Sequence, residues 1–157
     1  MPMTAPASMN RIVLRFKALD ENVGVARAAA AAVASQLPFS LSELEELRIA
    51  VSEAVTNAVL HAYPDDAVGD VELILTVDVG RERLEVEVRD EGRGIADLPS
   101  ALRPEVSSLK DHLGLGFAFM DSMSDEVSVE STPGKGTVVR FVKCPVRERQ
   151  DLTEPGS

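Results

Sequence analysis

The chain has 157 residues, of which 45% are hydrophobic and 27% are charged, and its formal net charge is −10 at pH 7. This length and composition are typical of one soluble globular domain. The acidic balance argues against a nucleic-acid partner, because binding to a phosphate backbone depends on clustered Lys and Arg side chains. An acidic surface would suit a basic protein partner, although it more often serves only to keep a protein in solution.

The single cysteine, Cys144, excludes an intramolecular disulfide, and with only two histidines a zinc site is not expected. No apolar run reaches the roughly 18 residues that a membrane span requires. Residues 1–9 lack a basic stretch followed by an apolar one, so we expect no signal peptide. The sequence therefore predicts a cytoplasmic protein without membrane contacts.

The first part of the chain predicts an arm, a strand and a helix. Residues 1–10 contain prolines and small polar residues and are expected to form a flexible arm. Apolar and polar residues alternate over 11–17, which indicates an edge strand. Asp20 is then expected to cap an alanine-rich helix that runs to about residue 37, where Pro38 would stop it.

A longer helix should follow and end near the turn residues 63–66. Its start allows two capping-box registers, Ser40 with Glu43 or Ser42 with Glu45. Apolar residues recur at helical spacing and predict the buried stripe of this helix. They are Leu44, Leu47, Val51, Val55, Ala58 and Ala62.

The remaining chain alternates strands with less regular segments. Residues 71–79 and 84–88 alternate in polarity and predict two strands joined by a hairpin turn at 80–83. Residues 96–113 lack a clear pattern and are expected to form a lid. A short helix is expected at 115–123, followed by strands at 127–130 and 138–142 around a glycine-rich turn. A disordered tail is expected at 147–157.

This order of elements predicts an α+β fold with one domain over residues 11–146. We expect a two-layer sandwich in which the helices cover one face of a mainly antiparallel mixed sheet, because each strand has one apolar and one polar face.

Three polar motifs stand out against this pattern, and the first lies on the long helix. Glu53, Asn57 and His61 are four residues apart, which places them on one helix face. A carboxylate there could act as a general base, and the Asn57 amide oxygen could bind Mg²⁺, which prefers oxygen ligands. The same spacing is also common on a solvated helix face, and it does not by itself decide between the two.

The second motif, Asp90-Glu91-Gly92-Arg93-Gly94, follows a valine-rich strand. A carboxylate at a strand end can accept a hydrogen bond from an exocyclic amine, and glycines let the backbone approach a ring or a phosphate. A simple turn after a strand would have the same pattern.

The third motif, Gly114-Leu115-Gly116, is expected to precede the short helix. Free N–H groups at a helix N-terminus attract anions, although a G-x-G turn alone is a weak signal. The chain has no P-loop and no G-x-S-x-G nucleophile turn. In this order, the three motifs together predict a nucleotide site.

The ordered set resembles the ATP-binding domain, with its Bergerat-type fold, shared by gyrase B, Hsp90, histidine kinases and MutL. The sequences 52–58, 61–63 and 88–95 are most similar to the anti-sigma factor serine kinases, the sporulation anti-sigma-F factors first and the general-stress anti-sigma-B kinases next. Residues 125–127 and 135–137 fit as well. The resemblance covers about residues 11–143 and implies an ATP-dependent protein serine/threonine kinase.

The resemblance also implies a role for each matching position. Glu53 would be the general base, Asn57 would hold Mg²⁺, and Asp90 would bind the adenine amine with Thr137 nearby. The glycines of the second motif would shape the adenine side, and those of the third would cradle the phosphates. The expected nucleotide-binding residues are Asn57, His61, Asp90, Gly92, Gly94, Gly114, Leu115, Gly116 and Thr137.

The implied partners are a sigma factor, which the protein would inhibit, and an anti-anti-sigma protein of the STAS type, whose serine would receive the phosphoryl group. Family members act as homodimers, and a bare sheet face around Ile74 is a candidate dimer surface. No direct contact with nucleic acid is implied.

His112 departs from the family pattern, since the sporulation kinases usually carry an arginine two residues before the first glycine of the third motif. Phosphoryl transfer depends on stabilisation of spreading negative charge, and a neutral imidazole would replace arginine poorly. Lys110 or Arg103 could substitute for it. Two hypotheses follow: a kinase with Glu53 and His112 in its catalytic set, or a nucleotide-dependent partner-switching binding module with little or no kinase activity. A detached histidine kinase domain is a weaker third reading.

Overall fold

The computed structural model describes residues 9–64, 67–103 and 113–146. Residues 1–8 of the predicted arm, residues 104–112 of the predicted lid and the predicted tail (147–157) lie outside the described residues. The strands are β1 (Met9–Lys17), β2 (Asp70–Asp78), β3 (Arg83–Asp90), β4 (Glu126–Thr132) and β5 (Gly136–Lys143). The helices are α1 (Glu21–Ala34), α2 (Leu41–His61), α3 (Leu98–Ala101) and α4 (Leu113–Met123).

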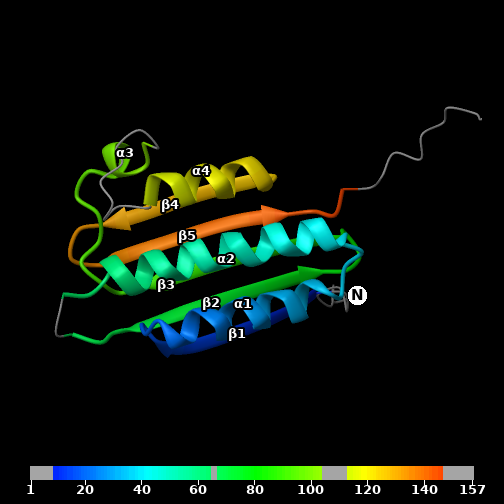
Figure 1. Ribbon diagram of the computed structural model, residues 1–157, viewed down its shortest axis with the longest axis horizontal. Helices are drawn as coiled ribbons and strands as arrows, with labels where there is room; N and C mark the ends of the chain where they lie inside the picture. Colours follow the sequence, from blue (N-terminus) through cyan, green and yellow to red (C-terminus); the bar gives the residue numbers. More distant parts are fainter. Residues whose placement is uncertain (1–8, 65–66, 104–112, 147–157) are drawn as a thin grey trace, which may run out of the picture.

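The five strands form one sheet in the order β1-β2-β3-β5-β4, and α1, α2 and α4 lie on one of its faces (Figure 1). This arrangement confirms the predicted α+β sandwich with helices on one side. Every neighbouring pair of strands is antiparallel, so none of the parallel pairing of a mixed sheet is found among these strands. The register places Asp90, the last residue of β3, directly opposite Thr137 of β5.

The core lies between the helices and the sheet, as the alternation in the strands predicts. Leu73, Leu75 and Val86 point to the helix side and are completely buried. From α2, Leu47, Val51 and Val55 meet them and are also completely buried. The helix therefore buries its apolar stripe against the sheet, and this leaves its polar residues at the rim.

The helix ends follow the predictions only in part. The side chain of Asp20 makes no capping hydrogen bond, so that prediction is wrong, and α1 ends at Ala34 rather than near residue 37. Its first turn is tied down instead by the Asn22 side chain, which donates to the carbonyl of Lys17. At α2, Ser40 and Glu43 form the capping box, which selects the first of the two predicted registers.

The open face of the sheet is covered with paired charges. Arg140 of β5 binds Glu85 of β3, with Nε and Oε1 2.7 Å apart, and approaches Glu126 of β4. On the same face, at the opposite edge of the sheet, Arg15 of β1 pairs with Asp70 of β2. Ile74, the residue expected to mark an apolar dimer surface here, is only 4% exposed and offers little apolar area.

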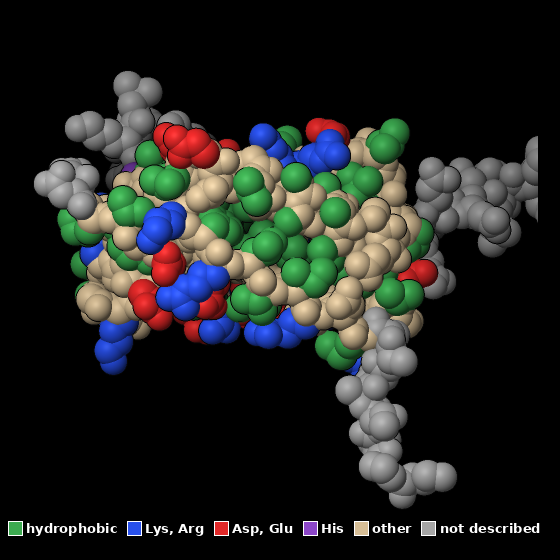
Figure 2. Space-filling model, turned by 90° about the horizontal axis from the view of Figure 1, so that it is seen from below, with side chains coloured by type: hydrophobic (Ala, Val, Ile, Leu, Met, Phe, Trp, Pro, Cys, Tyr) green, Lys and Arg blue, Asp and Glu red, His purple; other side chains and the backbone are tan. Residues whose placement is uncertain are grey.

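The edge of the molecule at β1 and α1 exposes apolar side chains. Met9, Val13 and Val25 are each about half exposed there, at 51%, 45% and 53%. Figure 2 views this edge and shows hydrophobic side chains gathered along it, with charged side chains at its borders. Because β1 starts at Met9, the last two residues of the predicted arm belong to this strand. Among the described residues, no helix is both long and apolar enough to cross a membrane.

Glu43 links the start of α2 to the end of β5. Its carboxylate accepts hydrogen bonds from the backbone N–H groups of Ser40 at 3.0 Å and Val146 at 2.9 Å. Burial by itself would raise the pKa of Glu43, but these bonds, the Ser40 hydroxyl and the charge of Lys143 together lower it. The ionised form of Glu43 therefore stabilises the folded chain.

Replacing Glu43 with Gln should reduce the free energy of unfolding by about 1–2 kcal/mol at pH 7, because one oxygen acceptor and the charge are lost. The stabilisation by a carboxylate with a lowered pKa is present above the unfolded-state pKa and is lost as the pH falls through the folded-state value. Urea unfolding at pH 7 and pH 3 should therefore show a smaller difference between variant and wild type at pH 3.

The matched control is Glu45→Gln, since Glu45 pairs with Arg48 on the exposed side of the same helix turn. It should change the free energy of unfolding by less than about 0.5 kcal/mol. An equal loss in both variants would show that the network around Glu43 has no special importance.

Candidate functional site

A cavity of about 250 Å³ opens between the C-terminal half of α2 and the ends of β3 and β5. Small side chains of α2 form one wall, and valines of the two strands form the floor. Its other walls come from the turn after β3 and from α3. The lining residues are Ala54, Asn57, Ala58, His61, Ala62, Val88, Asp90, Arg93, Gly94, Ile95, Ala96, Ala101, Thr137 and Val139.

Asp90 supplies a largely buried carboxylate to the lining of this cavity. Burial raises the pKa of Asp90, and the hydrogen bonds that it accepts from the N–H groups of Gly92 and Thr137 offset only part of that effect. The bond from Gly92 is 3.0 Å long. A donor N–H from a ligand would offset more of the cost of desolvation, so the site suits an amine-bearing ring.

The turn of residues 91–95 is held between α2 and the β4–β5 hairpin. The N–H of Arg93 donates to the carbonyl of Ala62 at 2.7 Å, and the N–H of Ile95 donates to the hydroxyl of Ser131 at 2.7 Å. Gly94 adopts a φ of +70°, and a side chain on Gly92 would collide with the backbone of Ala62. Glycine is required at both positions because the turn is both left-handed and closely packed.

Asn57 is the most unusual polar residue of the site. It is 7% exposed, and neither its amide oxygen nor its amide nitrogen has a hydrogen-bond partner among the described residues. An unpaired buried amide costs free energy, and natural proteins rarely retain one without a use. Asn57 is among the residues that line the cavity.

Glu53 lies one helical turn before Asn57, but it is not part of the cavity wall. It borders an open hollow with Arg27 and Arg48. A Cβ atom on Gly116 would lie 3.0 Å from its Oε2 atom and 3.6 Å from Nδ2 of Asn57. The first turn of α4 therefore reaches both polar residues of α2, and a side chain at position 116 would crowd Glu53.

The third motif differs from its prediction in one respect. α4 begins at Leu113, so Gly114 and Gly116 lie inside its first turn instead of preceding the helix. Gly114 packs against the carbonyl of Arg103 at the end of the described part of the lid, where a side chain would collide with it. The helix can start this early because both glycines remove side chains from a crowded position. His112 lies outside the described residues, and of Leu115 only the helical backbone is described.

Most of the predicted residues therefore meet in one region. Asn57, His61, Asp90, Gly94 and Thr137 line the cavity, Gly92 supports its turn, and Gly116 and Glu53 meet beside it. The described residues include no cluster of three or more His, Cys, Asp or Glu side chains arranged for a metal ion.

Sequence reasoning missed three side chains that hold the site together. The hydroxyl of Tyr63 accepts from the N–H of Glu91 at 3.1 Å and donates to the carbonyl of Asp70 at 2.6 Å. Ser131 shares a hydrogen bond of 2.8 Å with Thr137, and Arg93 donates to the carbonyl of His61. The bonds between Tyr63 and Glu91 and between Arg93 and His61 join residues 28 and 32 positions apart, and local patterns carry no signal for them.

Comparisons with known proteins agree with this geometry. The histidine kinase-like ATPase domain family matches residues 16–143. The anti-sigma F factor of Caldanaerobacter subterraneus subsp. tengcongensis is 39% identical, covering 89% of this chain and 97% of that protein. The anti-sigma F factor of Bacillus subtilis is 37% identical over 85% of this chain and 92% of its own length.

A crystal structure of the RsbU and RsbW domains of a Mycobacterium tuberculosis protein superposes with a TM-score of 0.62 at 19% identity. It covers 88% of this chain, which spans 33% of that longer chain, and at this identity it supports the fold alone. The matched region contains the complete cavity described above, from Ala54 to Val139. The chain therefore belongs to the histidine kinase-like ATPase domain family and, within it, to the family of the anti-sigma F factors.

Proposed function

We propose that this protein is an ATP-dependent protein serine kinase that also binds and inhibits a sigma factor. Its phosphoryl acceptor would be a serine of a STAS-type anti-anti-sigma protein. The similarity to anti-sigma F factors over nearly the whole chain supports the sigma-factor part of this proposal. The buried amide of Asn57, without a hydrogen-bond partner among the described residues and beside Glu53, carries the catalytic part.

The cavity is suited to the adenine of ATP. Its alanines and valines offer an apolar slot for a flat ring, and Asp90 in its lining would accept a hydrogen bond from the exocyclic amine. Thr137 lies opposite Asp90 in the strand register and would lie close to the same ring edge. The N-terminal turn of α4, with Gly114 and Gly116, would hold the phosphates through its free N–H groups.

Asn57 and Glu53 would then serve the transfer step. Mg²⁺, when bound, would neutralise charge on the phosphates, and the amide oxygen of Asn57 is a suitable ligand for it. Glu53 would accept the proton of the attacking serine hydroxyl. The serine oxygen would bond to the γ-phosphorus as the bond to the bridging oxygen breaks, and ADP would leave.

We also propose that the protein acts as a homodimer. The edge strand β1 would suit such a contact, since it has a free edge among the described strands. Met9, Val13 and Val25 supply exposed apolar surface at β1 and α1, and Val13 lies beside Ile74 on the open face of the sheet.

The Glu53→Gln variant should lose phosphorylation of the acceptor by at least about 100-fold, because removing a general base costs a factor of this order. Its affinity for ATP should stay close to that of the wild type. Incubation with γ-labelled ATP, Mg²⁺ and a panel of anti-anti-sigma proteins measures the transfer, and calorimetry measures the binding. A wild type that binds ATP but labels no acceptor would favour the binding-module alternative.

The Asp90→Asn variant should bind ATP about tenfold more weakly, because the acceptor for the adenine amine becomes neutral and can be turned away. Its circular dichroism spectrum should stay unchanged. The control is Asp70→Asn, since Asp70 pairs with Arg15 on the open face of the sheet. Equal affinities in the Asp90 variant and the wild type would remove the adenine role from Asp90.

The His112→Arg variant should transfer phosphate as fast as the wild type or faster, because a permanent positive charge stabilises the transition state better than a neutral imidazole. Single-turnover rates with the acceptor identified above would measure the effect. A large loss of rate would instead give His112 a function of its own.

A further inference from the structure

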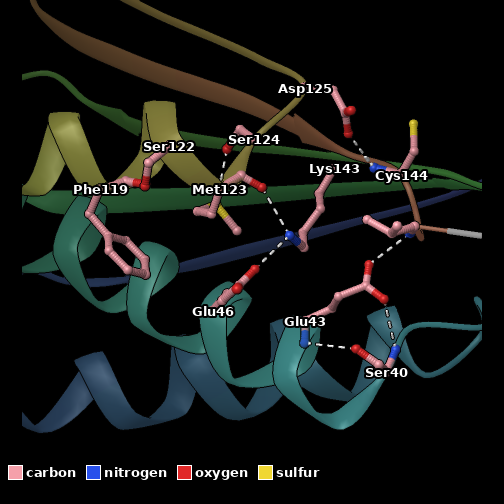
Figure 3. A network of polar contacts seen from close by, with 11 residues as sticks. Ser40, Glu43, Glu46, Phe119, Ser122, Met123, Ser124, Asp125, Lys143 and Cys144 are labelled. Carbon is pink, nitrogen blue, oxygen red and sulfur yellow. Dashed lines mark hydrogen bonds and ion pairs between the residues drawn. The ribbon is translucent and has the colours of Figure 1, made fainter. Parts of the chain in front are cut away.

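Lys143 lies far from the cavity, yet its buried amino group connects the two helices of the proposed site. Its side chain is 5% exposed. The Nζ atom lies 3.0 Å from Oε2 of Glu46 on α2 and donates at 2.9 Å to the carbonyl oxygen of Met123, the last residue of α4 (Figure 3). Burying an ammonium group is costly unless it is paired, so both bonds are needed to keep it there.

The position of this amino group also suits the helix dipole. A positive charge at a helix C-terminus interacts favourably with the free carbonyl groups of the last turn. The residues that follow α4 are held by the same strand, because the N–H of Asp125 donates to Val142 and the Asp125 carboxylate accepts from the N–H of Cys144. The C-terminal end of α4 is therefore fixed to both β5 and α2.

The opposite end of α4 meets the catalytic side of α2. Gly116 approaches Glu53, whereas Met123 is joined to Glu46 through Lys143. Glu46 and Glu53 are seven residues apart on α2, and Gly116 and Met123 are seven residues apart on α4. Seven residues of α-helix span about 10.5 Å. The two helices thus run antiparallel with matched spacing, and a shift of one along the other would have to break the Lys143 bonds.

We propose that Lys143 is a positioning residue for the phosphate end of the nucleotide site. By joining the last carbonyl of α4 to Glu46, it fixes how far α4 lies along α2 and therefore where its glycine-bearing first turn faces Glu53 and Asn57. This inference rests on the proposed nucleotide site. It predicts that Lys143 affects the binding of phosphates and leaves the binding of the adenine ring unchanged.

The Lys143→Met variant tests this directly, since methionine keeps an unbranched apolar side chain and removes the charge. The dissociation constant for ATP should rise about tenfold, the effect of one charge-assisted contact, and that for adenosine should change by less than about twofold. Glu46→Gln keeps one hydrogen-bond acceptor and should produce a smaller rise, about threefold, for ATP alone. Calorimetry on the full chain with Mg²⁺ present measures all four constants.

Arg140→Met is the matched control. Arg140 lies on the same strand but on the open face, and the variant loses a more exposed ion pair with Glu85. It should leave both dissociation constants unchanged. An equal rise for ATP and adenosine in Lys143→Met, or no rise at all, would overturn the proposal, because a purely structural role would not distinguish the two ligands.

Hydrogen exchange in the nucleotide-free protein provides a second measurement, which does not require that the proposed site binds a nucleotide. Amides in the first half of α4 should exchange faster in Lys143→Met and Glu46→Gln than in the wild type and in Arg140→Met. Unchanged exchange would overturn the positioning role. A wild type that binds neither ATP nor adenosine would refute the proposed function, and the exchange data would still decide whether Lys143 holds α4. If Lys143→Met fails to fold, Glu46→Gln carries both measurements.

Discussion

The packing of α2 against the sheet is the constraint on which the rest of this protein depends. Leu47, Val51 and Val55 are completely buried against the strands, so the rotation of the helix about its axis is fixed. With the rotation fixed, Asn57 has to lie at the wall of the cavity and Glu53 one turn before it. The hydrophobic effect thereby determines the position of an amide whose own bonding is incomplete within the described chain.

The site is assembled by turns and helix ends that pack on this frame. The turn after β3 is tied to α2 through Ala62 and to the β4–β5 hairpin through Ser131, which places Asp90 and Thr137 side by side. α4 lies on α2, with Gly116 packed beside Glu53 and Asn57. Contacts to adenine would therefore come from the turn after β3 and from β5, and contacts to the phosphates from α4. Substitutions can change one set of contacts without the other.

Charged and apolar side chains are distributed unevenly over the surface of the chain. The open face of the sheet carries Arg and Glu side chains that pair with one another, whereas the edge at β1 and α1 exposes Met9, Val13 and Val25. Surface ion pairs contribute little to stability but disfavour an apolar partner. The contact proposed above between two copies of the chain would use the β1 edge, where Val13 lies beside Ile74.

The sequence by itself determined the order of the elements, the buried faces and the residues of the three motifs, because helical and strand periodicity and glycine positions are local properties. For the capping box of α2, the sequence left two registers open, and the structure contains the first, Ser40 with Glu43. Only the tertiary structure decided that Asp20 makes no cap, that α4 begins at Leu113, and that Glu53 lies outside the cavity wall. The bonds between Tyr63 and Glu91 and between Lys143 and Glu46 likewise join residues 28 and 97 positions apart. Such contacts follow from how the layers pack, and no local pattern encodes them.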